Sequence, residues 1–184
     1  MNLEADGAYL KLAVPDLKDF LLSGQPFWPI GSIPTALGEP GADTLSIGGT
    51  LVALARYQAA RPAATEPYVQ QVADVRKTWR ANWDKKAAKE FTARVKLWSQ
   101  AVDEILQPGA GRSKLYLSRI RLRVMLEFLS QNNSEIPAGD VMQLVLMDKR
   151  LQASLQDGEF VWEPEVKAAF PEQPFWYLYR TVSS

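Results

Sequence analysis

The sequence predicts an all-α protein, a helical bundle built on one very long helix at about residues 65–107. Apolar residues between Tyr68 and Ile105 recur at spacings of 4, 3, 4, 4, 4, 4, 4, 3, 4 and 3, which is the period of an amphipathic helix. No Pro or Gly interrupts the chain between Tyr68 and Gln107. Such a helix would be about 65 Å long, whereas a compact chain of this length is roughly 40 Å across. The helix must therefore bend or project.

The first 40 residues predict a short helix around Asp16–Ser23 and then an irregular, Pro-rich N-terminal arm. Pro15 precedes this helix and Gly24 follows it, as is common at helix ends. Three prolines between residues 25 and 34 disfavour both a helix and a central strand. We expect Phe27 and Trp28 to pack on the helices, so that the arm is a strap; binding of a partner by the arm is the alternative.

A second helix is predicted to begin at Asp43 or Thr44 and to end near Ala60, before the Arg61-Pro62 pair. Gly48 and Gly49 near its start each weaken a helix by roughly 1 kcal/mol relative to Ala. We therefore expect the backbone to pack closely against another helix at these glycines.

The long helix has Thr65 as its expected N-cap and ends before Pro108-Gly109. Its spacings of four from Trp79 onward exceed 3.6, so the apolar stripe drifts around the helix axis. Asn82 and Asp84 are weak helix formers within this region. We predict that any bend lies beside them.

A third helix is predicted at about residues 113–131, and it is apolar over most of its circumference, as is typical of a central helix. Its one polar arc contains Arg119, Arg123, Glu127 and Ser130. Arg123 and Glu127 are four residues apart and are expected to pair.

Arg121 instead falls on the apolar side of this helix, where a guanidinium group needs a carboxylate partner. Asp148 lies within the apolar face of the next predicted helix, residues 138–156. A short loop joins the two helices, which favours antiparallel packing. We predict a structural ion pair between Arg121 and Asp148.

Residues 158–184 form an aromatic-rich, partly irregular C-terminal tail, with seven aromatic residues that we expect to cover the core. Residues 159–162 and 175–179 are either two short strands or irregular packing. Pro164 is expected to begin a short helix that ends before Pro171. The whole chain, 1–184, is predicted to be a single helical domain with an arm (1–40), a helical core (43–157) and the tail (158–184).

The chain contains no Cys and no His. Disulfides, thiolate zinc sites, cysteine nucleophiles and histidine-based catalysis are therefore excluded. We expect no enzymatic activity, no cofactor, no metal site and no small-molecule substrate. The alternative is a magnesium site that combines Asp103 and Glu104 with Glu127 or Asp148.

No apolar run approaches the roughly 18 residues that span a bilayer. The first six residues carry two acids, where a signal peptide would carry basic residues. We expect a cytoplasmic location without membrane association.

The charges are balanced overall, but residues 76–123 hold 13 basic and 4 acidic residues. We expect a non-catalytic scaffold or adaptor that associates with a protein partner, or with a second copy of itself, through the long-helix face. Its expected anchors are Trp79, Trp83, Phe91 and Trp98.

The alternative is an accessory nucleic-acid-binding protein that uses the basic, tryptophan-bearing segment 76–123. Its cations would contact phosphates, and exposed indoles would stack on bases. The expected basic patch consists of Arg76, Lys77, Arg80, Lys85, Lys86, Lys89 and Arg94.

Overall fold

The computed structural model describes residues 2–25, 27–30 and 44–182, and the fold is mostly helical. The helices are α1 (Leu3–Leu22), α2 (Ile47–Ala60), α3 (Pro62–Thr78), α4 (Arg80–Leu106), α5 (Arg112–Ser130) and α6 (Ala138–Gln152). Short 3-10 helices follow at η1 (Pro164–Ala169) and η2 (Trp176–Tyr179). Two short antiparallel sheets pair β1 (Trp28–Pro29) with β2 (Thr44–Leu45) and β3 (Leu155–Asp157) with β4 (Arg180–Val182).

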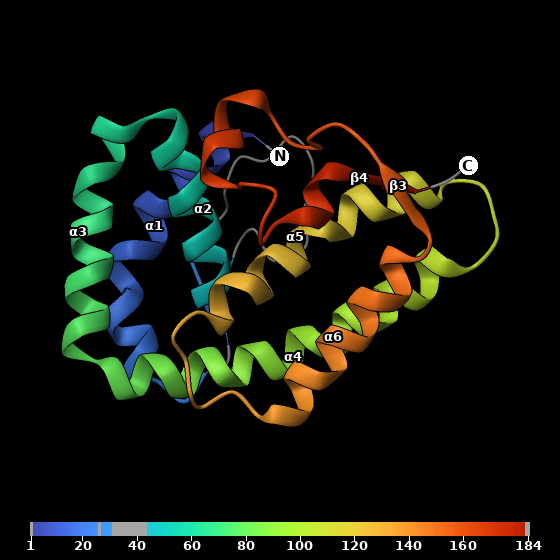
Figure 1. Ribbon diagram of the computed structural model, residues 1–184. Coiled ribbons are helices and arrows are strands. Elements are labelled where there is room, and N and C mark those ends of the chain that lie inside the picture. Colours follow the sequence, from blue (N-terminus) through green and yellow to red (C-terminus); the bar gives the residue numbers. More distant parts are fainter. Residues whose placement is uncertain (1, 26, 31–43, 183–184) are drawn as a thin grey trace.

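The helices surround a core that α5 crosses (Figure 1). Helices α1, α2 and α3 are grouped on one side, α4 runs beneath α5, and α6 lies along the outside of α4. The tail returns over α5. Buried side chains from all six α-helices and from the tail form the hydrophobic core. The structure contains no helix, within the ranges it describes, that combines the length and the apolar character needed to cross a membrane.

Helix α1 is longer than predicted, since it begins at Leu3 and continues through Pro15. Asn2 caps it, because its side-chain oxygen accepts a hydrogen bond from the Glu4 amide at 2.9 Å. A proline removes one intrahelical hydrogen bond and favours a kink. The fully buried side chains on both sides of Pro15 offset that cost; they include Leu10, Val14 and Leu17.

Helix α2 begins at Ile47, later than predicted, because Thr44 and Leu45 pair with β1. Ser46 caps the helix by accepting a hydrogen bond from the Gly49 amide at 3.1 Å. Its end at Ala60 agrees with the prediction. Of the arm, residues 26 and 31–43 lie outside the described residues. Trp28 packs on the helices as expected and donates a hydrogen bond to Asp16 at 3.2 Å. The expectation for Phe27 is wrong, because this side chain is 42% exposed.

The prediction of one long helix is wrong, because α3 and α4 are separate helices with a break at Trp79. Trp79 has φ −113° and ψ 37°, outside the helical region, and it precedes the predicted bend at Asn82 by three residues. Helix α3 also begins at Pro62 rather than at Thr65. The two helices run along different sides of the molecule (Figure 1). The chain therefore changes direction at Trp79, whereas a straight helix of about 65 Å would extend beyond the body of the protein.

Helix α5 has nearly the predicted bounds, whereas α6 ends at Gln152 and packs on α4 instead of lying antiparallel on α5. The α4–α6 contact includes a hydrogen bond from the Thr92 hydroxyl to Asp140 and an ion pair of 2.8 Å between Asp103 and Arg150. After α6 the chain enters β3, which ends the helix four residues before its predicted end.

The aromatic tail covers the core, as predicted, with Phe170, Phe175 and Tyr177 buried. The two proposed strands at 159–162 and 175–179 do not form; η2 and irregular structure occupy those positions. The short helix after Pro164 is confirmed as η1. Aromatic rings pack edge to face in the tail, for example Trp162 and Phe170 with centroids 4.9 Å apart.

Candidate groove between α2 and α3

The predicted interface anchors lie mainly inside the chain. Trp83, Phe91 and Trp98 are 2%, 0% and 0% exposed, and Trp79 is half-buried against the same core. Because α3 and α4 wrap around the body of the protein, their apolar stripe meets α1, α2 and α5 rather than a partner. The prediction that these aromatic residues form an exposed association face is therefore wrong.

The predicted basic patch is divided among several places, and Lys86 and Arg94 are bound to groups of other parts of the fold. Lys86 binds backbone carbonyls at the C-terminal end of α1, those of Phe20 and Ser23. Arg94 forms a 2.6 Å ion pair with Glu90 and donates a hydrogen bond to Ser46. Neither side chain is available as an isolated surface cation.

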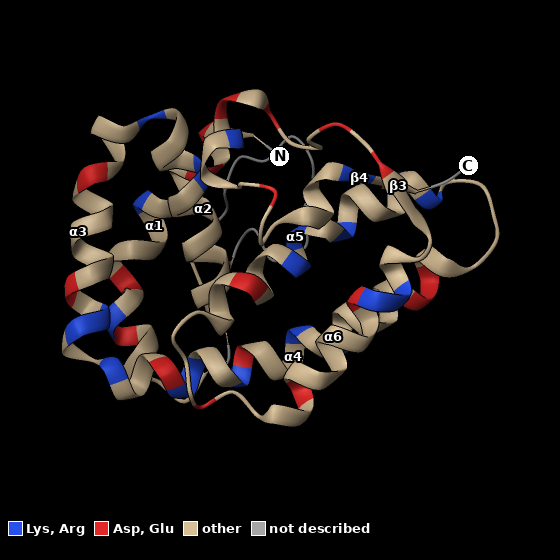
Figure 2. Ribbon diagram, viewed as in Figure 1, with Lys and Arg blue, Asp and Glu red and all other residues tan. Residues whose placement is uncertain are grey.

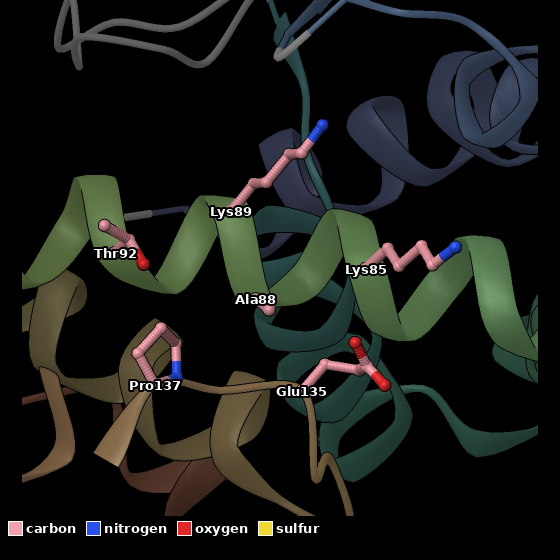
Figure 3. A pocket seen from close by; sticks show the side chains of 6 residues that line it. All are labelled: Lys85, Ala88, Lys89, Thr92, Glu135 and Pro137. Atoms are coloured by element: carbon pink, nitrogen blue, oxygen red, sulfur yellow. The ribbon is translucent and has the colours of Figure 1, made fainter. Parts of the chain in front are cut away.

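Lys85 and Lys89 line a shallow groove of about 260 Å³ between α4 and the loop after α5. Figure 3 shows the carboxylate of Glu135 on the loop side, extending toward α4, while Lys89 points away from it. Thr92 and Pro137 close the other end. The two lysines do not converge on one point with the remaining basic residues, so this groove offers no focused anion site.

Arg76, Lys77 and Arg80 gather at a larger groove between α2 and α3, with a volume of about 810 Å³. An apolar wall accompanies these three cations. It is formed by Leu51 and Leu54 of α2 and by Val69, Val72 and Ala73 of α3, and Asn132 completes the lining. The groove is thus apolar along most of its length and cationic where α3 ends.

Helical periodicity places the α3 side chains along this groove. Val69, Val72, Ala73, Arg76 and Lys77 follow one another at steps of 3, 1, 3 and 1, which aligns them on one face of a helix. The close connection at Arg61 brings α2 alongside, so that its side chains complete the wall. From the sequence, Val72, Arg76 and Lys77 were identified, but neither Val69 and Ala73 nor the α2 side of the groove.

The arginines at the cationic end are held in place. The Arg76 guanidinium group lies 5.4 Å from the ring centroid of Trp83 and donates to the carbonyl of Gln131. Burial, and next the neighbouring Arg80, lower the pKa of Arg76 from its ordinary value, yet an arginine stays protonated at neutral pH. Lys77 is exposed and completes the cluster.

Arg80 forms an ion pair of 2.5 Å with Asp84 and donates a 2.7 Å hydrogen bond to the Asn132 carbonyl. The loop after α5 therefore fixes the positions of both arginines, which still carry positive charge to the end of the groove. An arginine held by carbonyl acceptors is ordered before any ligand arrives, which lowers the entropic cost of binding.

The predicted ion pair between Arg121 and Asp148 is wrong, because Arg123 is the partner of Asp148. Its Nε donates to both carboxylate oxygens at 3.0 Å. Arg123 also pairs with Glu127 at 3.1 Å, as predicted. It is only 6% exposed and lies over the ring of Tyr177, so its placement in the exposed arc of α5 is also incorrect.

A second buried ion-pair cluster joins α1, α2 and the tail, and no spacing or motif in the sequence indicated it. Arg56 is completely buried and pairs with Asp6 at 2.8 Å and with Glu163 at 3.0 Å. Burial raises the pKa of Asp6, while Arg56 and then Arg121 lower it.

The acids of the magnesium hypothesis are not gathered. Asp103 pairs with Arg150, whereas Glu127 and Asp148 share Arg123. Within residues 2–25, 27–30 and 44–182 no three carboxylates are close enough to hold a metal ion.

Searches against protein-family models, curated proteins and solved structures find no match to this chain.

Proposed function

We propose that the protein is a non-catalytic adaptor, and that the groove between α2 and α3 binds an apolar, acidic segment of a partner protein. The observation that carries this proposal is the combination in one groove of an apolar wall with three cations at one end. Protein–protein association would then use the exposed side of α3 and not the buried indoles.

The chemistry of the groove selects the type of partner. Half-buried Leu51 and Leu54 face Val69 across the groove, and apolar side chains of a partner would remove this surface from water. A short amphipathic helix that places apolar residues at i, i+3, i+4 and i+7 suits such a groove. Carboxylates near one end of that helix would meet Arg76 and Lys77.

The cations give the bound segment a direction. Opposite charges at an interface increase the association rate and disfavour the reversed orientation more than they add affinity. Lys77 is exposed, so its contribution is expected to depend on salt. The apolar wall then supplies most of the binding free energy.

Selection from a displayed library of random 16-residue peptides (about four helical turns) tests this function. We expect enrichment of peptides that combine helix-spaced apolar residues with Asp or Glu near one end. Ala73→Gln fills the groove from an exposed position and is expected to weaken the selected peptides by about tenfold or more. Lys77→Glu should weaken them by about fivefold and reduce the salt dependence.

Two matched variants serve as controls. Ala64→Gln makes the same change at an exposed site near the start of α3, and Lys114→Glu reverses an exposed charge on α5. Both should bind the selected peptides as the original chain does. Failure to enrich any peptide family, or equal effects of Ala73→Gln and Ala64→Gln, would contradict the proposal.

Labelled oligonucleotides at about 50 and 200 mM salt distinguish the nucleic-acid alternative. Six or more phosphate contacts would reduce affinity about a thousandfold between these salt concentrations. Such binding, lost on Lys77→Glu and unaffected by Ala73→Gln, would favour nucleic acid over a protein segment as the occupant of this region.

A further inference from the structure

The loop that follows α5 closes the cationic end of the groove between α2 and α3. Asn132 of this loop lines the groove. Arg76 donates to the Gln131 carbonyl at 3.4 Å. Arg80 donates to the carbonyl of Asn132 at 2.7 Å, and the Asn133 side chain donates a bond of 3.0 Å to a backbone carbonyl of α4. A segment that lies in the groove along α3 must therefore end, or turn away, at this loop.

The charge at the closed end is positive. Asp84 pairs with Arg80 and balances it. Arg76 instead contacts a carbonyl and the ring of Trp83, and Lys77 is exposed next to it in the sequence. The bond to the carbonyl uses one of the five N–H groups of a guanidinium, so Arg76 keeps donors for a carboxylate. The closed end of the groove therefore suits an anionic group.

The same side of α3 is acidic toward the opposite end of the groove. Glu66 is exposed and precedes Ala73, which lines the groove, by seven residues. Seven residues are about two helical turns, so the two side chains lie on one side of α3. Figure 2 shows acidic colouring near the beginning of α3 and basic colouring where α3 passes into α4. The apolar wall thus lies between a negative charge and the positive closed end.

We propose that the occupant of the groove is the C-terminal helix of a partner protein, and that its free α-carboxylate binds Arg76 and Lys77. This inference rests on the proposed adaptor function and specifies which part of the partner binds. The C-terminal end of a helix carries partial negative charge and the N-terminal end partial positive charge. With its C-terminus at Asn132, the bound helix is parallel to α3. Its negative end then meets Lys77, and its positive end lies toward Glu66.

The closed end disfavours two other modes of binding. A helix in the reverse direction would place the partial positive charge of its N-terminus against Arg76 and Lys77. A segment from the middle of a partner chain would have to turn away at Asn132 and would bring no terminal carboxylate. Charge complementarity acts mainly by rejecting such wrong orientations and partners.

The apolar wall sets the length of the bound helix. Val69 and Lys77 are eight residues apart in α3, which is about 12 Å along a helix axis. The last two or three turns of the partner, about 8–11 residues, therefore fill the groove. We expect apolar side chains in this stretch at helical spacing, directly before the terminus.

Two displayed libraries of random peptides of about 16 residues, four helical turns, test the terminus. In one library the peptide ends in a free C-terminus, and in the other the chain continues into the carrier protein. We expect the peptides enriched from the first library to bind at least tenfold more tightly. Amidation of a selected synthetic peptide should weaken its binding about fivefold, and the difference should decrease as salt is added.

The ratio of the affinities for the acid and the amide form of one peptide isolates the contact with the carboxylate. Lys77→Gln should lower this ratio by about threefold. Lys114→Gln, the same change at an exposed position on α5, should leave it unchanged. A general change in the shape of the groove affects both peptide forms alike and does not alter the ratio. Circular dichroism verifies that both variants are folded.

Nuclear magnetic resonance with a nitroxide label on the selected peptide tests the direction. A label on a side chain in the last turn of the peptide should broaden the amide signals of residues 131–133. A label in its first turn should broaden those around Glu66. The reverse pattern would overturn the parallel orientation.

The outcomes separate this inference from the adaptor function. Equal affinities from the two libraries, or no effect of amidation, would overturn the role of the free C-terminus. If Ala73→Gln still weakens those peptides, the groove remains a binding site for protein segments. Failure of both libraries to yield a peptide that Ala73→Gln weakens contradicts the adaptor function itself, and the inference is overturned with it.

Discussion

At the scale of single residues, the Glu90 side chain of α4 links this helix to the backbone of α2. It is 4% exposed and accepts hydrogen bonds from the amides of Ile47 and Gly48 at 2.8 and 3.1 Å, and Arg94 donates to it at 2.6 Å. The first amides of a helix have no intrahelical partner and carry partial positive charge. The carboxylate of α4 therefore completes the N-terminus of α2 while Arg94 balances its charge.

Gly48 makes this contact possible and gives a first prediction. A Cβ atom at this position would lie 2.8 Å from Glu90 Oε1 and 3.1 Å from Met125 Cβ. Replacing Gly by Ala in an open helix stabilises it by about 1 kcal/mol. We expect Gly48→Ala instead to destabilise the protein by about 1–3 kcal/mol, measured by urea unfolding, because overpacking displaces a carboxylate that several donors hold.

Gly139→Ala provides the control, because a Cβ atom there meets no atom within 4 Å and the residue is in the first turn of α6. Its stability should be unchanged or slightly higher. Equal stability of Gly48→Ala and Gly139→Ala would show that the close approach of α2 to Glu90 is incorrect.

An ion pair between an arginine of α5 and Asp148 of α6 was predicted correctly, but the arginine is Arg123 and not Arg121. Arg121 and Arg123 differ by two residues, which is about 200° around a helix. The choice between them depended on which side of α5 faces Asp148, and α6 was expected to lie antiparallel on α5. Because α6 packs on α4 instead, Asp148 approaches the side that carries Arg123.

At the scale of elements, periodicity identified the helical character of about residues 65–107 but not the break in the middle. Neither Pro nor Gly marks Trp79, and its local sequence is compatible with helix. The break depends on tertiary contacts: the half-buried indole and the carbonyls of Gln131 and Asn132, which accept from Arg76 and Arg80. Contacts between residues more than 50 positions apart leave no periodic signal.

The junction of α1 and α4 gives a second prediction. Helix α1 has no basic residue in its last turn, and Lys86 of α4 supplies one by donating to the carbonyls of Phe20 and Ser23. A cation stabilises the partial negative charge at a helix C-terminus. We expect Lys86→Met to destabilise the protein by about 1–2 kcal/mol and to increase amide exchange in the last turn of α1.

Lys85→Met is the matched control, since Lys85 is adjacent but exposed at the shallow groove. It should change the free energy of unfolding by less than about 0.5 kcal/mol. If the two variants are equally stable, or if exchange in α1 does not respond to Lys86→Met, the lysine does not cap α1.

At the scale of the whole molecule, the sequence predicted a helical fold, the positions of most helices and an aromatic tail over the core. It also found the cations of the proposed groove, Arg76, Lys77 and Arg80. It could not supply the apolar wall from α2, because Leu51 and Leu54 look like ordinary core residues until α3 is placed beside them. Which of several apolar stripes is buried is decided by the packing of all helices together.

Three tyrosines that are buried in the core give the last prediction. Burial raises the pKa of Tyr9, Tyr116 and Tyr177 above the usual value of 10.0. The Tyr116 hydroxyl donates to the Tyr177 carbonyl, and Tyr9 bonds near the N-terminus of α2, so ionisation would also break internal contacts.

A phenol with a higher pKa in the folded state keeps its proton there, whereas the unfolded chain releases it near pH 10. The stability due to these groups is thus complete below about pH 10 and decreases as the pH rises further. We expect absorbance at 295 nm to show Tyr9, Tyr116 and Tyr177 ionising in one cooperative step, together with loss of the helical circular dichroism, above about pH 11. Tyr68→Phe removes a half-buried phenol and should leave that step in place. Ionisation of all six tyrosines in a single gradual titration near pH 10, with the helical signal retained, would mean that these rings are open to water and that the tail does not seal the core.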